Sequence, residues 1–336
     1  MFRTLQFPAT AVSFLEGNRE LRVFLDTKPQ LTDGEMTEQT VSVEPGDPAA
    51  FAVQAALASG LNGLKVNERA ASEGKVEGVH KLRVTARRIR SALDTFRSLI
   101  EPAWADHLGG ELKWLGGKLG DVRDQDVLRG RLAFTAEQMG TSDALAPLFA
   151  DLEQRHTAAS EALREALHSE RYPTLIGFLS DAMAELPFKD DAWQPCRDAL
   201  PPLVEPLWKT LKRRGRALSP DDPDDDFHEV RKDAKRARYA AEAFQEALDV
   251  KPASEAARFA RKAKKVQDIL GLHQDAVVAS KQIREAALAR IDLGPFNFAA
   301  GQLLERELRE ALDNRALFFE VWHALDRQKN VRWLKT

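Results

Sequence analysis

The sequence predicts an all-α protein, and three observations support that fold class. Apolar residues recur at the helical period from about residue 47 almost to the C-terminus. Turn-prone residues divide this region into segments joined by short loops, as in antiparallel helix bundles. A histidine-containing basic pattern occurs twice along the chain, which predicts two similar helical units.

Residues 1–46 differ from the rest of the chain. Residues 20–25 and 40–43 have the composition of short strands or extended arms, and the turn-prone run Thr32-Asp33-Gly34 separates them. We therefore expect a short extended or small β segment at residues 1–46. It should be followed by two helical repeats, at residues 47–190 and 191–336.

Glycine and proline mark the expected ends of about ten helices. The expected boundaries are Glu101-Pro102, Gly116-Gly117, Gly120, Gly140, Tyr172-Pro173, Pro201-Pro202, Gly215, Pro220 through Pro223, Pro252, Gly271 and Gly294-Pro295. The acidic run that includes Asp224, Asp225 and Asp226 should favour the N-terminus of the helix that follows it.

Charge and cysteine content exclude several classes of protein. The 49 Lys and Arg residues are outnumbered by 52 Asp and Glu residues, so any anion must be held by a local basic cluster. The single cysteine, Cys196, permits neither a disulfide nor a cysteine-based zinc site. The N-terminus lacks a signal-peptide pattern, and no stretch approaches the roughly 18 apolar residues of a membrane span. We therefore expect a cytoplasmic protein without membrane contact.

The repeat is visible when residues 79–90 and 227–238 are aligned. His80 matches His228 at a shift of 148 positions, which is 228 minus 80. The other matched pairs are Arg83/Arg231, Arg87/Lys235, Arg88/Arg236, Arg90/Arg238 and Phe96/Phe244. Downstream, Leu119-Gly120 with Asp124 matches Leu270-Gly271 with Asp275 at a shift of 151, or 275 minus 124. The two units therefore share two motifs in the same order.

Helical geometry places the cations of each unit on one face. At about 100° per residue, the four basic side chains of a unit fall within an arc of about 80°, opposite the apolar residues. The first basic face consists of His80, Arg83, Arg87 and Arg90, and the second consists of His228, Arg231, Lys235 and Arg238. Each face runs about 15 Å along its helix.

Like charges at these spacings destabilise a helix slightly, so structure alone gives little reason for them. A single basic face would be read as solvated surface. The same histidine at the same phase in two helices favours a shared ligand instead. Guanidinium groups pair bidentately with phosphate oxygens, and histidine adds a further donor beside an anion. The pattern therefore predicts a site for an inorganic polyanion.

These residues resemble the CHAD family, the histidine-containing α-helical domain. The resemblance covers about residues 48–330 and rests on ordered motifs in both units. The matching runs are His80-Lys81-Leu82-Arg83-Val84, Arg123-Asp124-Gln125-Asp126-Val127 and His228-Glu229-Val230-Arg231-Lys232. The resemblance implies two four-helix bundles related by a pseudo-twofold axis, with a basic central groove. It also implies binding of inorganic polyphosphate and association with polyphosphate granules.

Many family members carry a fused CYTH domain marked by Glu-x-Glu-x-Lys, a motif that does not occur near this N-terminus. We therefore expect a binding protein without enzymatic activity. The expected polyphosphate-binding residues are the two basic faces with Arg88, Arg236, Lys212, Arg213 and Arg216. Asp124 and Asp275 are expected either to orient a basic side chain or to cap a helix after Gly120 and Gly271.

Three functions are weighed. Polyphosphate binding requires only the cations. A nucleic-acid-binding protein would use the same surface but would normally add stacking aromatics, and apart from Tyr239 none lies among the basic residues. A phosphatase or kinase would need a metal site, a nucleophile or a phosphate loop, and the sequence has no such pattern. We expect no cofactor, metal ion or catalytic residue.

Overall fold

The computed structural model describes residues 43–244 and 247–335. Eight of its α-helices are α3 (Ala49–Ser72), α4 (Val76–Thr95), α5 (Pro102–Gln138), α6 (Ala146–His168), α9 (Pro201–Ala217), α10 (Asp224–Phe244), α11 (Val250–Leu288) and α12 (Gly294–Leu325). The segments α7 (Arg171–Ala182) and α8 (Cys196–Ala199) connect the two sets. Short 3₁₀ turns lie at Arg97–Leu99, Asp190–Trp193, Gln328–Asn330 and Arg332–Lys335. The all-α prediction is confirmed.

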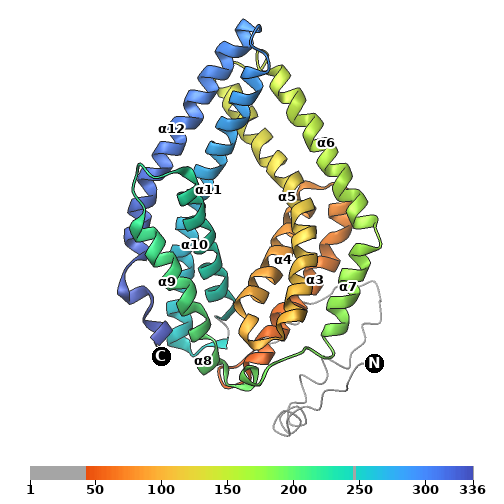
Figure 1. Cartoon of the computed structure of the whole chain (residues 1–336), viewed down its shortest axis with the longest axis vertical. Helices are drawn as coiled ribbons and strands as arrows, with labels where there is room; N and C mark the ends of the chain where they lie inside the picture. The colour runs from red at the N-terminus through yellow and green to blue at the C-terminus, as the bar shows by residue number, and fades with distance from the viewer. Residues whose placement is uncertain (1–42, 245–246, 336) are drawn as a thin grey trace.

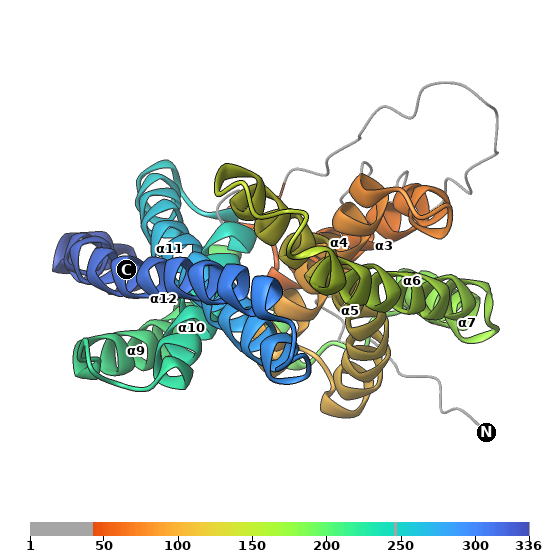
Figure 2. The same cartoon turned by 90° about the horizontal axis from the view of Figure 1, so that it is seen from above.

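The helices form two units with the same order of packing. In the first unit α3 packs on α4, α4 on α5 and α5 on α6, and in the second α9 to α12 follow the same sequence. The units occupy opposite sides of a diamond-shaped outline, and the long hairpins α5–α6 and α11–α12 meet at one end (Figure 1). From above, the units again lie on opposite sides of the centre (Figure 2). The pseudo-twofold axis and the domain boundaries stay predictions.

One hydrophobic core joins the units at the end where the repeated helices meet. It combines apolar faces of α3, α4 and α5 with those of α9, α10 and α11. The matched residues Phe96 and Phe244 are both fully buried and touch edge to face, with ring centroids 5.1 Å apart. This contact fixes the C-terminal ends of α4 and α10 against each other.

A second core forms where the long hairpins cross. It contains Leu132 of α5 and Leu152 of α6 together with Ile283 of α11 and Leu303 of α12. Polar contacts also link the units here, because Arg131 of α5 pairs with the buried Glu307 of α12 at 2.7 Å. The two cores hold the units together at both ends of the molecule.

Several glycines predicted to end helices lie inside them instead. Helix α5 continues through Gly116, Gly117 and Gly120, and α11 continues through Gly271. Gly215 likewise lies within α9, where a Cβ atom would approach the Trp322 ring to 2.5 Å. Gly215 allows close packing, whereas Gly117 has nothing within 4 Å of a Cβ atom. The prediction that these positions break helices was wrong, because the helices continue through all of them. The boundaries expected at Pro102, Gly140, Pro201 and Gly294 are confirmed.

The acidic loop before α10 supports the helix start as expected. Asp224, Asp225 and Asp226 lie in the first turn of α10, where carboxylates favour the helix N-terminus. Arg315 of α12 donates to the backbone oxygens of Pro220 and Asp222, each at 2.9 Å, and so fastens the loop.

The extended segment predicted for residues 1–46 lies almost entirely outside the described residues. Within the described ranges there is no strand, and only two isolated β-bridges occur, Pro48 with Pro195 and Ile100 with Phe188. None of the helices in these ranges combines the length and the apolar character that a bilayer crossing requires.

Replacing two helical glycines by alanine should change stability in opposite directions. Gly215→Ala should lower the free energy of unfolding by about 1–3 kcal/mol, because the new methyl group would overlap the buried Trp322 ring. Gly117→Ala should raise it by up to about 1 kcal/mol, since that exposed position has open space and alanine favours the helix. Urea unfolding measures both. Equal effects would contradict the packing described for α9.

Candidate functional site

The two basic faces approach each other across the contact between α4 and α10. Lys235 of α10 is half-buried, and burial is the main cause that lowers its pKa to about 8. The charges of Arg87, Arg90 and Arg83 on α4 and of Arg231 on α10 lower it further. Cations from both units therefore act on one ammonium group.

These cations have few acidic partners. Arg83 pairs with Asp124 at 3.0 Å, and Arg238 lies 3.4 Å from Glu242. Among the described residues, no carboxylate lies within ion-pair distance of the other three arginines of the two faces or of Lys235. Burial is the main cause that lowers the pKa of Arg87; its interaction with Tyr239 opposes this, and the charges of Arg83 and Arg238 add to it. The site therefore concentrates positive charge in a partly desolvated place.

Several polar atoms of the site are buried without a hydrogen-bond partner. They are Nε of Arg87, Arg231 and Arg238, Nδ1 of His228 and the hydroxyl of Tyr239. A buried donor without a partner is costly in a folded protein, and such groups call for an explanation. Their gathering at one place is what a site for a multivalent acceptor would show.

Arginines of both basic faces lie against glycines of α5 and α11. A Cβ atom at Gly120 would lie 3.9 Å from Nη2 of Arg83, and one at Gly271 would lie 3.5 Å from Nε of Arg231, both ordinary contact distances. Matched arginines of the repeat therefore lie against matched glycines of the neighbouring helix. Gly116 has a similar relation to Arg90, at 3.9 Å from its Nη1.

Asp124 and Asp275 accompany these glycines inside helices, so neither caps a helix start. Asp124 forms an ion pair with Arg83, and its side chain is 69% exposed. Burial raises the pKa of Asp275, and the charges of Arg231 and Arg131 oppose that effect. The carboxylates therefore lie close to Arg83 and Arg231, and the orienting role expected for them stays a prediction.

The histidines lie toward the N-terminal ends of the two faces. Both His80 and His228 are half-buried. Burial and the charges of Arg231 and Lys232 lower the pKa of His228, while a hydrogen bond with Gln274 of α11 opposes this. An added anion would favour the imidazolium form of His228, because it would offset the neighbouring cations.

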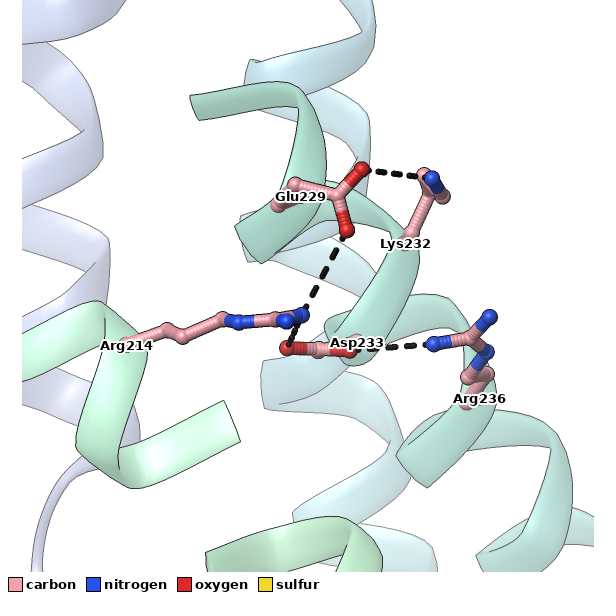
Figure 3. Close-up of polar contacts among 5 residues, drawn as sticks. All are labelled: Arg214, Glu229, Lys232, Asp233 and Arg236. Atoms are coloured by element: carbon pink, nitrogen blue, oxygen red, sulfur yellow. Dashed lines mark hydrogen bonds and ion pairs between the residues drawn. The ribbon is translucent and has the colours of Figure 1, made fainter. Parts of the chain in front are cut away.

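Other expected ligands lie elsewhere. Arg88 and Arg236 are exposed on the flanks of their helices, and Arg236 pairs with the buried Asp233 at 3.3 Å. Figure 3 shows this flank of α10, where Asp233 also accepts a hydrogen bond from Arg214 of α9 at 2.8 Å. Asp233 lies about 160° around the helix from Lys235. Helix α9 therefore packs on the far side of α10 from the second basic face.

Three further cations expected in the site lie on α9. Lys212 and Arg213 share this helix with Arg214, and Arg216 forms an ion pair of 2.5 Å with Asp326 after α12. The expectation that these three residues extend the basic surface stays a prediction.

Sequence reasoning placed Tyr239 only at the edge of the second basic face. In the structure it is 6% exposed and touches Arg87 of the first unit as well as Arg238 of its own. Its helical phase is about 20° from that of His228, so the sequence did carry the information. Only the neighbouring helix showed that the ring lies between the units.

The described residues offer no obvious alternative chemistry. They contain no group of three or more His, Cys, Asp or Glu side chains that could hold a metal ion. The Cys196 thiol is buried, and burial raises its pKa to about 12, so it is a poor nucleophile. The basic faces are therefore the candidate site.

Comparison with known proteins identifies the family of this chain. The CHAD domain model matches residues 55–284. Uncharacterized proteins from two strains of Mycobacterium tuberculosis are 30% identical over 279 residues, which is 78% of this chain. The chain spans about half the length of these curated relatives, at 50%.

Two solved structures share the fold. The crystal structure of the CHAD domain from the plant Ricinus communis is 28% identical, with a TM-score of 0.69, and the match covers 88% of this chain and 98% of that one. PptA from Streptomyces chartreusis is 23% identical with the same TM-score of 0.69, covering 82% and 99%. The second likeness concerns the fold alone.

Removing the charge of Lys235 should stabilise the protein. Lys235→Met should raise the free energy of unfolding at pH 7 by about 1–2 kcal/mol, because it removes a cation that burial and four arginines disfavour. The folded pKa near 8 lies below the ordinary 10.5, so the unfolded chain binds more protons between these values. Wild-type stability should therefore rise with pH there, and the advantage of the variant should shrink.

Urea unfolding at pH 7 and pH 9.5 measures this difference. Lys281→Met, at an exposed position of α11, is the matched control and should change little at either pH. A Lys235→Met variant that is no more stable than wild type at pH 7 would show that the charges around Lys235 are already compensated.

Proposed function

Because the chain belongs to the CHAD domain family and its two basic faces converge, we propose that it binds inorganic polyphosphate without catalysing its turnover. The ligands are His80, Arg83, Arg87, Arg90, His228, Arg231, Lys235 and Arg238. The observation that carries this proposal is the contact of α4 with α10, which places Arg87 of one unit over the Tyr239 ring of the other. The charges of Arg83, Arg87 and Arg90 of α4 accordingly act on Lys235 of α10. A chain of phosphates placed there would neutralise cations of both units at once.

The chemistry of binding follows from the groups present. Arginine guanidinium groups donate two parallel hydrogen bonds to phosphoryl oxygens, and the buried Nε atoms of Arg87 and Arg231 lack a hydrogen-bond partner. Bound phosphate would favour the charged form of Lys235, whose pKa is otherwise lowered by its neighbours. Binding in a partly desolvated place strengthens each of these interactions.

Extended polyanions suit the site better than orthophosphate does. Each basic face extends about 15 Å along its helix, which is far longer than a single phosphate group. A longer chain contacts more cations and releases more counterions on binding. Affinity should therefore rise with chain length and fall with salt. Docking on polyphosphate granules in the cytoplasm would be the cellular consequence that we propose.

Nucleic acid is the alternative ligand that the arrangement supports less well. Sequence-tolerant binding of single strands commonly uses exposed aromatic rings on which bases stack. The aromatic residue of the site, Tyr239, is buried and has guanidinium groups of Arg87 and Arg238 over its ring. That ring is thus engaged before any ligand arrives.

Removing four central cations should abolish most binding while leaving the fold intact. A variant with Arg83, Arg87, Arg231 and Lys235 changed to Ala should bind long-chain polyphosphate at least about 100-fold more weakly, because charge-assisted hydrogen bonds are lost. The dependence of log K on log salt should become shallower by about 3. Isothermal titration at two salt concentrations measures both, and none of the four residues lies on an apolar face.

The matched control removes four exposed cations elsewhere: Lys209, Lys264, Arg284 and Arg309. Both variants change the formal net charge from −3 to −7, since four positive charges are removed. Similar losses of affinity in the two variants would mean that net charge, and not the converging faces, governs binding. Absence of binding by wild type would refute the proposed function.

Competition should discriminate polyphosphate from nucleic acid. We expect single-stranded RNA, matched to polyphosphate in number of phosphates, to displace labelled polyphosphate only at concentrations at least about 10-fold higher, because bases gain no stacking platform here. Fluorescence anisotropy at constant salt measures the displacement. RNA that competes as well as unlabelled polyphosphate would favour the alternative function.

A further inference from the structure

We infer that Tyr239 is a ligand and positioning residue of this site: its ring holds Arg87 and Arg238 in place, and its hydroxyl donates a hydrogen bond to the bound polyanion. The inference rests on the proposed function and extends it to an uncharged residue. Tyr239 lies on α10 between the C-terminal contact of the two units and the cations of the second basic face.

The hydroxyl of Tyr239 is the first observation. The side chain is 6% exposed, and its oxygen is buried beside the guanidinium of Arg87, which interacts with it. A guanidinium only donates, and no acceptor for the O–H of Tyr239 lies at hydrogen-bond geometry among the described residues. The other tyrosine of the chain provides a comparison, since the buried hydroxyl of Tyr172 donates to the backbone oxygen of Leu64 at 3.4 Å. Buried tyrosine hydroxyls usually have such a partner. The O–H donor of Tyr239 therefore suits an acceptor brought by a ligand.

The ring of Tyr239 is the second observation. The guanidinium carbon of Arg238 lies 4.2 Å from the ring centroid, and that of Arg87 lies 5.5 Å from it. The face of an aromatic ring attracts cations, so one ring acts on arginines of both units. These two arginines repel each other, and the charge of Arg238 adds to burial in lowering the pKa of Arg87, while Tyr239 raises it. Their contacts with the ring restrict side-chain motion that binding would otherwise have to restrict.

Asymmetry of the repeat is the third observation. The position that matches Tyr239 is Ser91, at the shift of 148, which is 239 minus 91. The first unit therefore supplies no second ring at the matched position. One tyrosine therefore contacts arginines of both units. It differs in this from residues that occur at the same packing position in both units.

Two substitutions separate the roles of the hydroxyl and the ring. Tyr239→Phe keeps the ring and should weaken binding of long-chain polyphosphate roughly 10-fold, as expected for one hydrogen bond to a charged acceptor. Its melting temperature should equal or exceed that of wild type, because the substitution removes a buried O–H donor that has no acceptor in the free protein. Tyr239→Leu should weaken binding roughly 100-fold and make the salt dependence shallower, since Arg87 and Arg238 lose their support.

Tyr172→Phe is the matched control and should leave the affinity unchanged. The measurements are isothermal titration at two salt concentrations and thermal unfolding of each free protein. If wild type binds polyphosphate and Tyr239→Phe binds it equally tightly, the proposed role of the hydroxyl is refuted. Equal affinities of the Phe and Leu variants would overturn the role of the ring. If Tyr239→Leu fails to fold, Tyr239→Phe still tests the role of the hydroxyl. The role of the ring is then tested with Tyr239→Trp, which keeps an aromatic face and should retain the wild-type salt dependence of binding.

Wild type that fails to bind polyphosphate would refute the proposed function, and this inference with it. If wild type binds polyphosphate and the Tyr239 variants bind it with the same affinity, only the inference about Tyr239 is refuted.

Discussion

The rest of the structure is organised around cations of like charge that two helices hold close together. The positive charges of Arg87 and Arg90 in the other unit act on Lys235. No carboxylate among the described residues lies within ion-pair distance of any of these three side chains. Such an arrangement opposes folding, because bringing like charges together in a partly buried place is unfavourable. The scaffold must therefore supply the free energy that keeps α4 and α10 in position.

Two hydrophobic cores provide that support at opposite ends. Near the repeated helices, Phe96 and Phe244 join the units in a shared core. At the other end the long hairpins α5–α6 and α11–α12 build a core of their own, with the ion pair of Arg131 and Glu307 beside it. Because packed cores resist deformation, charge repulsion between the two contacts cannot separate the helices. A polyanion would relieve that repulsion without requiring a new fold.

Particular residues show where sequence reasoning succeeded and where it failed. The phase of Arg83, Arg87 and Arg90 follows from local helical geometry and is independent of the partner helix. Gly120 and Gly271 were interpreted as helix ends because isolated glycine usually weakens a helix. In the structure both lie inside long helices, where Arg83 and Arg231 pack against them. Their effect depends on a neighbour that local propensity does not include.

By itself, the sequence determined the all-α class, the repeat and the face of each helix that carries the cations. These features depend on residues within a few turns of one another, so spacing alone specifies them. Tertiary structure decided which helices face each other: α9 packs through Arg214 on the side of α10 away from its basic face, and Tyr239 lies between arginines of both units. Distances between distant segments are set by how the cores pack, and that packing is a property of the whole chain.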